Sequence, residues 1–289
     1  MKIAISGSTG FIGKQVTDYL LRNGNEILVI SRKDFADADN RLAKIINSAE
    51  VILNFAGSSV LCRWNKQNRA QILSSRIETT RLLVEAVRKN SSDHTPKVFV
   101  NASAIGIYEN SGIHDETSSA LGSDFLASVC KAWEQETESL KDVNVRTCIV
   151  RIGIVLGKTG GTLGKLLPLF KAGLGGKIGT GKQSFSFIHI LDFCRIIEHL
   201  IDNHDSSGIY NLTSPEPTTN ELFTKALAKA MHRPDIFTVP EFSLKLIYGE
   251  AAGIITSGIY AKPTHLLNEN FQFQFPDITS AIGDLVQNS

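Results

Sequence analysis

The start of the chain alternates between short apolar runs and one amphipathic run. Lys2–Ser6 and Glu26–Ile30 are apolar enough to form buried strands. Between them, Lys14–Asn23 carries apolar residues at helical spacing, and Gly24 follows in the usual position after a helix C-terminus. A strand, a helix and a second strand within so short a span predict a βαβ crossover with parallel strands.

The same alternation continues through the first half of the chain. Further strands are expected at Val51–Phe55, Lys97–Asn101 and Val145–Val150, and helices at Gln67–Lys89 and Asp124–Leu140. Nearly continuous apolar strands separated by helices are typical of a parallel sheet covered on both faces. We therefore predict an α/β fold, a Rossmann-type doubly wound parallel sheet with a small C-terminal substrate lobe.

The pattern changes in the second half of the chain. Gly157–Gly181 is rich in glycine and has few strand signals, which favours a mobile lid or substrate loop. Phe185–Ile190 and Gly208–Leu212 are expected to be short strands that return to the sheet, and the chain after Pro215 is helical. The predicted units are a Rossmann domain at 1–157, a substrate loop region at 158–183, returning strands at 184–213 and a helical lobe at 214–289.

Charge and composition exclude several classes of protein. Thirty Lys and Arg against twenty-nine Asp and Glu leave a net charge of +1, so no strong field attracts nucleic acid or an anionic membrane. No apolar run is long enough to span a bilayer, and the first residues lack a signal-peptide pattern. The four cysteines are widely spaced and the histidines do not cluster. These features predict a cytoplasmic protein with reduced thiols and no metal site.

The strongest chemical signal is a glycine-rich turn directly after the first strand. Small residues there let the backbone turn sharply and let a pyrophosphate approach the N–H groups at the helix start, where the helix dipole favours an anion. The spacing G-x-x-G-x-x-G departs from the commoner G-x-G-x-x-G, but its place between a strand and a helix predicts dinucleotide binding. The cofactor-binding residues expected here are Gly7, Ser8, Thr9, Gly10, Phe11, Ile12 and Gly13.

The end of the second strand indicates which nicotinamide cofactor is preferred. An acidic residue there binds the adenosine ribose of NAD, whereas an arginine accommodates the 2′-phosphate of NADP. Here the strand is followed by Ser31, Arg32 and Lys33, and Asp34 is the first acid. Two cations and a hydroxyl suit a phosphate, so we predict NADP rather than NAD.

Several segments together resemble a known family. The glycine turn, Asn54-Phe55-Ala56-Gly57 and the segment from Phe187 to Asp192 resemble the extended short-chain dehydrogenases/reductases. More narrowly, the chain is similar to the atypical, sugar-nucleotide-epimerase-like branch often labelled "cell division inhibitor", a label that no residue supports. The segments that carry this resemblance are Arg63-Trp64-Asn65, Ser74-Ser75-Arg76, Ser103 to Tyr108, Trp133-Glu134, Arg151 to Gly157 and Tyr210 to Pro217. The tail from Val239 to Phe273 resembles the C-terminal region of unknown function in that branch.

The resemblance also has implications for the cofactor site. It adds Phe55, Ala56 and Gly57 to the expected cofactor-binding residues. Only eighteen residues separate Arg32 from Val51, where the family usually has another strand. We therefore expect the third strand to be lost or reduced, which would loosen the adenine pocket.

For catalysis, the resemblance implies a Ser or Thr together with a Y-x-x-x-K segment. Ser103 matches the serine and Lys131 the lysine, but the position four before Lys131 is Ala127, so the tyrosine is missing. Tyr108, at the end of the strand that holds Ser103, is a candidate replacement or a packing residue. An alignment anchored on Glu134 would instead place Cys130 in the lysine position.

Two further polar residues are candidate substrate ligands. Arg151 lies at the carboxyl end of a predicted strand, the edge where open α/β sheets bind ligands, and is either a substrate contact or part of a structural ion pair. His189 lies beside the glycine-rich region, and nearby Asp192 is either functional or a helix cap.

Two functions follow from these observations. The first is an NADP-binding epimerase or oxidoreductase that acts on a small molecule, either a sugar nucleotide or a similar polar carbonyl or alcohol compound. The second is a non-catalytic NADP(H)-binding protein that senses redox state or regulates a partner, which the missing tyrosine favours. A homodimer is the assembly to test.

Overall fold

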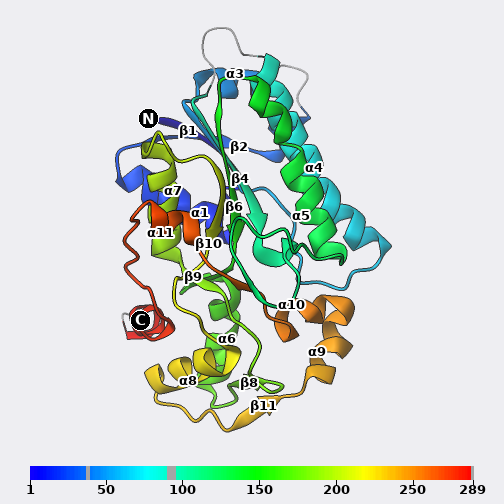
Figure 1. The fold of residues 1–289 in the computed structure, drawn as a ribbon, viewed down its shortest axis with the longest axis vertical. Helices are drawn as coiled ribbons and strands as arrows, with labels where there is room; N and C mark the ends of the chain where they lie inside the picture. The colour runs from blue at the N-terminus through cyan, green and yellow to red at the C-terminus, as the bar shows by residue number, and fades with distance from the viewer. Residues whose placement is uncertain (37–39, 90–95, 288–289) are drawn as a thin grey trace.

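A six-stranded parallel sheet forms the upper half of the molecule in a computed structural model that describes residues 1–36, 40–89 and 96–287. The strand order is β10-β6-β4-β3-β1-β2 (Figure 1). The strands are β1 (Lys2–Ser6), β2 (Glu26–Ile30), β3 (Val51–Asn54), β4 (Val98–Ala104), β6 (Arg146–Ile152) and β10 (Gly208–Leu212). The predicted Rossmann-type α/β fold is confirmed.

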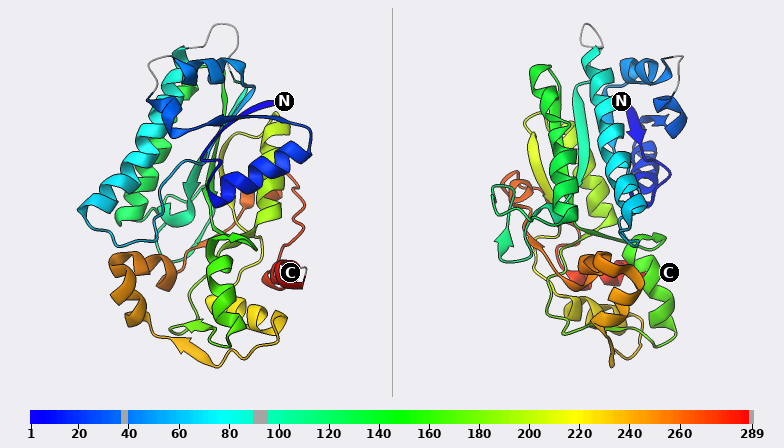
Figure 2. Two further views of the ribbon diagram at one scale, coloured as in Figure 1. Left: turned by 180° about the vertical axis from the view of Figure 1, so that it is seen from behind. Right: turned by 90° about the vertical axis from the view of Figure 1, so that its right-hand side faces the viewer.

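Helices cover both faces of this sheet, as the apolar strands predict (Figure 2). One face carries α1 (Phe11–Arg22) and α7 (Ile190–Asp202), which contact each other. The other carries α3 (Arg41–Ser48), α4 (Lys66–Lys89) and α5 (Phe125–Gln135).

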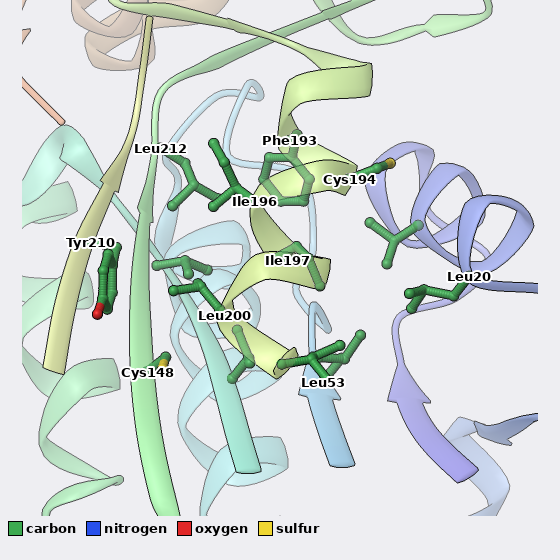
Figure 3. Packing of buried hydrophobic residues seen from close by; sticks show 14 of the residues in the cluster. Leu20, Leu53, Cys148, Phe193, Cys194, Ile196, Ile197, Leu200, Tyr210 and Leu212 are labelled. Carbon is green, nitrogen blue, oxygen red and sulfur yellow. The ribbon is translucent and has the colours of Figure 1, made fainter. Parts of the chain in front are cut away.

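The core beneath α7 shows how the layers are held together (Figure 3). Phe193, Ile197 and Leu200 point from α7 towards the sheet, where they meet Leu53 of β3 and Leu212 of β10. All five side chains are buried, and burying each contributes roughly 1.5–3 kcal/mol. This packing fixes the strand ends on which the site is built.

Among the described residues, no strand pairs with the outer edge of β2, where the resemblance leads us to expect another one. In the described residues between β2 and β3, the chain forms the short helix α2 (Arg32–Phe35) and then α3. β2 pairs only with β1 among the described strands. The expectation that the third strand is lost is confirmed for this part of the chain.

The lower half of the molecule differs from its prediction in two places. The glycine-rich stretch is not an open loop, because it contains α6 (Gly161–Lys171) and β8 (Gly176–Ile178). The strand expected at 185–190 is β9 (Phe187–His189), and it pairs with β7 (Ile154–Gly157) in a separate two-stranded sheet instead of returning to the main sheet.

The C-terminal residues complete this lower half. They form α8 (Asn220–Ala230), β11 (Phe237–Val239), α9 (Glu241–Tyr248), η3 (Gly249–Ala252), α10 (Gly253–Thr256), β12 (Tyr260–Ala261), α11 (Thr264–Asn268) and α12 (Ile278–Gln287). A second apolar core joins α6, α8 and α12. In contrast, α11 packs against β10 of the main sheet. The remaining short elements are β5 (Ile113–His114), which pairs with β12, and the turns η1 (Ile105–Ile107) and η2 (Glu138–Asp142).

Candidate functional site

The turn between β1 and α1 can only be built with glycine at two of its positions. Gly7 has a positive φ of +77°, and a Cβ there would lie 2.6 Å from the backbone carbon of Phe55. A Cβ on Gly13 would lie 2.2 Å from the carbonyl oxygen of Gly7. Gly10 is different, because a Cβ there would meet only the Gly7 oxygen, at 3.3 Å. Gly7 and Gly13 are therefore required by packing, whereas Gly10 keeps a surface at the helix start free of side chain.

The other residues of the turn lie in different surroundings. Ser8 is half-buried and Thr9 is exposed, and neither lines the cavity described below. Phe11 and Ile12 do line it, and both are half-buried. Three glycines around the start of α6 pack against the ring of Phe11, namely Gly157, Gly160 and Gly161. This close packing explains why a helix can begin in a stretch so rich in glycine.

After β2, the structure separates the cations from the nearby acid. Ser31, Arg32 and Lys33 are exposed, whereas the Asp34 carboxylate is buried. Asp34 Oδ2 accepts hydrogen bonds from the backbone N–H and the hydroxyl of Ser31, both at 2.6 Å, and Oδ1 lies 2.9 Å from Nε of Arg41. Burial alone would raise the pKa of Asp34, but the hydrogen bonds from Ser31 lower it overall. The Asp34 carboxylate is thus bonded to Ser31 and Arg41, and the exposed Arg32 and Lys33 remain free to bind an anion.

A cavity of about 1340 Å³ opens where the carboxyl ends of the strands meet the C-terminal residues. Gly10, Phe55 and Ser103 line it from the β1, β3 and β4 ends of the sheet. The link from β6 to β7 contributes further wall, as do α4, α5, α6, α8, α9 and α10 and several loops. In Figure 1, α9 and α10 lie directly below the end of α5. This arrangement places the glycine turn and the C-terminal lobe in one cavity, a common design for an enzyme site.

Hydrogen bonds between buried polar side chains fix the end of β3 and the segment that follows it. Asn54 accepts a hydrogen bond from Ser6 at 2.6 Å and donates to Thr80 at 2.8 Å and to Asn101 at 2.7 Å. Phe55 and Gly57 then line the cavity, whereas Ala56 does not.

Ser103 belongs to a connected polar network behind the cavity. Its hydroxyl donates to Glu134 at 2.6 Å. Arg151 binds both oxygens of Glu134, at 2.9 and 2.8 Å, and donates to the Tyr108 hydroxyl at 2.9 Å. That hydroxyl in turn donates to Asn211 at 2.9 Å. The structure therefore brings three of the predicted residues together, through two partners that sequence reasoning did not assign.

Within this network, Tyr108 and Arg151 support Ser103 and do not line the cavity. Both are buried, and Tyr108 stacks on His114 with ring centroids 4.9 Å apart. Burial raises the pKa of Tyr108, and the nearby Arg151 offsets only part of that effect. A phenol in this environment stays protonated. The idea that the Tyr108 hydroxyl faces a nicotinamide pocket does not agree with this placement.

The face of α5 decides between the two alignments of the missing Y-x-x-x-K motif. Leu126 and Cys130, four residues apart, line the cavity. Ala127 is buried away from it, and the exposed Lys131 donates to the carbonyl of Gly122 at 2.8 Å. The structure thus agrees with the alignment anchored on Glu134, in which a leucine and a cysteine stand where the motif has tyrosine and lysine. Burial raises the pKa of Cys130 to about 11, so its thiol is neutral.

His189 is placed in the core between the two halves. It is buried, its Nδ1 accepts the backbone N–H of Leu191, and its ring lies 3.9 Å from that of Phe275. Its Nε2 lies 3.3 Å from Asp284 of α12, and burial lowers its pKa. His189 does not line the cavity, and its contacts are those of a residue that caps α7 and anchors α12.

Arg76 of α4 is a cavity residue that the predicted set of site residues omits. Its Nη1 donates to the carbonyl of Ile72 at 3.1 Å, and its guanidinium carbon lies 5.1 Å from the centre of the Trp133 ring. Burial lowers its pKa. The only sequence signal was its place in the segment Ser74-Ser75-Arg76.

Two other arginines, Arg63 and Arg69, connect the two halves of the molecule. Arg63 donates to the carbonyls of Leu246 and Ile247 at the end of α9, and Arg69 pairs with Glu250 in η3. These contacts hold the C-terminal helices over the cavity, which gives the segment Arg63-Trp64-Asn65 a structural role.

Two further findings limit the kinds of site present. Within residues 1–36, 40–89 and 96–287, no group of three or more His, Cys, Asp or Glu side chains is arranged to hold a metal ion. No helix in the same residues is both long and apolar enough to cross a membrane.

Comparisons with known proteins agree with the fold and the site. The model of the NAD dependent epimerase/dehydratase family matches residues 3–213, and that of a domain of unknown function (DUF1731) matches residues 239–285. The epimerase family protein YfhF of Bacillus subtilis is 33% identical, with 99% of this chain and 98% of the relative covered. The structure of human epimerase family protein SDR39U1 with NADPH has a TM-score of 0.91 and 30% identity, with both chains fully covered. UDP-glucose 4-epimerase of Thermotoga maritima, solved with UDP-glucose, has a TM-score of 0.80 at 16% identity over 99% of this chain and 98% of that one, which shows only the shared fold.

These findings confirm the resemblance to the epimerase-like branch and its C-terminal region. None of the names above carries the "cell division inhibitor" label.

Proposed function

Since this chain belongs to the NAD dependent epimerase/dehydratase family, we propose that it binds NADP(H) and acts as an oxidoreductase or epimerase on a small carbonyl or alcohol compound. The observation that carries the proposal is the glycine turn, which opens at Gly10 into the same cavity as Ser103. The human relative of similar sequence and fold was solved with NADPH, which supports the choice of cofactor.

The residues around the turn fit such a cofactor. The surface at Gly10 that is free of side chain would admit the pyrophosphate to the start of α1. The exposed Ser31, Arg32 and Lys33 would hold the 2′-phosphate, because the nearest acid is already occupied. Phe55 and Gly57 would flank the cofactor between these two places.

A bound NADPH would supply hydride to a carbonyl carbon and solvent the proton for the carbonyl oxygen, so the protein has to position that oxygen. Ser103 is the polar side chain on β4 that lines the cavity. We assign its hydroxyl the role of a hydrogen-bond donor to the substrate oxygen, to which its single O–H turns from Glu134 when the substrate binds. In the ligand-free protein Glu134, locked in place by Arg151, accepts that O–H and holds the hydroxyl at the cavity wall. Tyr108 and Lys131 have no direct part in this step.

Other parts of the function stay predictions. A sugar nucleotide is a candidate substrate by the resemblance, and the structure of low identity solved with UDP-glucose supports the fold alone. A cytoplasmic location and a homodimer are further expectations.

The proposal is tested by following NADPH absorbance while the protein is supplied with carbonyl compounds. Wild type should consume NADPH with a suitable compound, and Ser103→Ala should lower kcat by about 100-fold while NADPH affinity is retained. Ser128→Ala is the matched control, because that hydroxyl is exposed on α5 and bonds only the carbonyl of Phe125. Tight NADPH binding without turnover of any carbonyl compound would contradict catalysis and support the redox-sensing alternative.

A further inference from the structure

Arg76 is a cation of the cavity wall that the proposed mechanism leaves without a role. We propose that Arg76 binds the carboxylate of the substrate, and that this substrate is an amphipathic acid with an apolar body. The inference rests on the proposed function, because it names the class of compound that the same cavity takes.

Arg76 has no counter-charge among the described residues. Its guanidinium makes one hydrogen bond there, to the carbonyl of Ile72, and no ion pair. The acids that line the cavity are engaged elsewhere, since Asp124 caps α5 and Glu250 pairs with Arg69. Removing a guanidinium from water without a carboxylate partner costs free energy. A ligand that supplies a carboxylate would therefore bind strongly to Arg76.

The contacts of the Arg76 guanidinium fix its orientation for binding a planar anion. Its plane is supported by Trp133, which lies 5.1 Å away, and by the hydrogen bond to Ile72. Gly57 leaves the space that the guanidinium occupies, because a Cβ at that position would lie 3.0 Å from the guanidinium carbon. A fixed guanidinium fork matches the two oxygens of a carboxylate.

The helices on either side of the cavity present apolar side chains to it. From α5, Leu126 and Val129 line the cavity, and from the C-terminal helices, Leu244, Ile254 and Ile255 do so. The many hydroxyl groups of a sugar would find few hydrogen-bond partners on these helices.

Away from the glycine turn, a second diphosphate, carried by a sugar-nucleotide substrate, would be poorly neutralised in this cavity. Among the described residues that line it, Arg76 and Lys165 are the cations, and Lys165 is exposed on α6. One fixed cation among apolar residues suits a single carboxylate joined to an apolar chain.

The position of Cys130 connects this anion site with Ser103. The thiol of Cys130 lies close to both Ser103 and Arg76, and all three residues line the cavity. It is neutral, because burial raises its pKa to about 11, so it leaves the charge of Arg76 uncancelled. A carboxylate on Arg76 would bring the adjacent atoms of the ligand towards Ser103. The substrate is therefore an oxo or hydroxy acid whose reacting carbon lies near its carboxylate.

Calorimetry with octanoate and 1-octanol as probes tests the inference on protein saturated with NADP+. Octanoate should bind more tightly than 1-octanol to wild type. Arg76→Met, which removes the charge and keeps an apolar side chain, should weaken octanoate at least tenfold and leave 1-octanol and NADPH binding unchanged. Arg81→Met on the same helix is the control, because Arg81 is exposed and pairs with Glu136; it should leave octanoate binding unchanged.

Thermal unfolding of the ligand-free variants provides a second readout. If Arg76 serves a ligand, Arg76→Met should melt at the same or a higher temperature than wild type, since it removes a desolvated, unpaired charge. A purely structural role predicts a lower melting temperature and an equal loss of octanoate and 1-octanol.

The remaining outcomes separate the two proposals. Unchanged octanoate affinity in Arg76→Met overturns the inference, as does UDP-glucose binding that is tighter than octanoate and depends on Arg76. Loss of NADPH binding in Arg76→Met would assign Arg76 to the cofactor and also overturn it. If wild type binds no NADPH, the proposed function fails. The octanoate titration on ligand-free protein then still decides the role of Arg76.

Discussion

The β1–α1 turn and the cavity face of α5 belong to the same site, yet they relate to their family pattern in opposite ways. The turn keeps Gly7 and Gly13 because backbone atoms come so close to these two positions that almost any side chain would collide. The face of α5 forms a helix that presents Leu126 and Cys130 to the cavity, the two positions at which the alignment anchored on Glu134 places the tyrosine and lysine of the motif.

This difference shows which parts of such a site can vary. The turn is constrained by backbone packing, which a substitution destroys. The α5 face is constrained only by volume and polarity, so apolar residues can replace a proton relay without loss of the fold. The chemistry then depends on Ser103 and the groups behind it. The following predictions test that contrast.

The largest effect is expected where the network behind Ser103 is broken. Arg151→Met would leave Glu134 buried without its cation and should lower the free energy of unfolding by about 3–5 kcal/mol. Arg81→Met removes the exposed partner of Glu136 and should cost less than about 1 kcal/mol. Urea unfolding of both variants measures the two losses, and equal losses would contradict the role of Arg151 as a buried support.

The glycine turn should separate folding from binding. Gly13→Val forces a side chain into the Gly7 carbonyl and should destabilise the fold by several kcal/mol, as overpacking and backbone shifts do. Gly10→Val makes a milder contact, with its Cβ 3.3 Å from the Gly7 oxygen, so it should still unfold cooperatively with a smaller loss of stability than Gly13→Val, but bind no NADPH. Micromolar NADPH affinity in Gly10→Val would show that the cofactor lies elsewhere.

The cations after β2 should set the cofactor preference. Arg32→Ala removes an expected contact with the 2′-phosphate, so NADPH should bind about 10-fold more weakly, as for the loss of a charge-assisted hydrogen bond, while NADH is unaffected. Calorimetry of both cofactors measures the difference. An equal loss for NADPH and NADH would remove Arg32 from the phosphate site.

The buried acid of the same turn should give a stability that depends on pH. The pKa of Asp34 is lowered in the folded state, so its contribution is present above its unfolded pKa of about 3.9 and is lost as the pH falls through the lower folded value. Asp34→Asn should therefore cost about 1 kcal/mol at neutral pH, as for the loss of a helix cap, and less at acid pH. A cost that stays constant below about pH 3 would contradict an ionised Asp34.

The smallest effect is expected at Lys131. It is exposed and bonds one carbonyl, so Lys131→Ala should change the unfolding free energy by less than about 0.5 kcal/mol and leave NADPH affinity and turnover unchanged. A large loss of turnover in this variant would restore Lys131 to catalysis and contradict the α5 register seen in the structure.

The sequence was sufficient where chemistry follows from local pattern. Glycines placed directly after a strand predicted the turn from Gly7 to Gly13, and the short spacing from Arg32 to Val51 predicted the lost strand. Helix α6 was missed because the glycines around its start, three of which contact Phe11, resemble those of a loop.

The sequence was not sufficient where the orientation of a helix decides the answer. Lys131 and Cys130 are neighbours, and only the packing of α5 against β4 shows which of them faces the cavity. Tyr108 depends in the same way on where the chain turns after β4. Arg76 could not be recognised as unpaired until the positions of all nearby acids were known.

The most direct test of the account is a calorimetric titration of the wild-type protein with NADPH and with NADH. The account predicts tight binding of one NADPH per chain and much weaker binding of NADH. Binding of neither cofactor would contradict it, because it would mean that the site without a third strand no longer holds a dinucleotide.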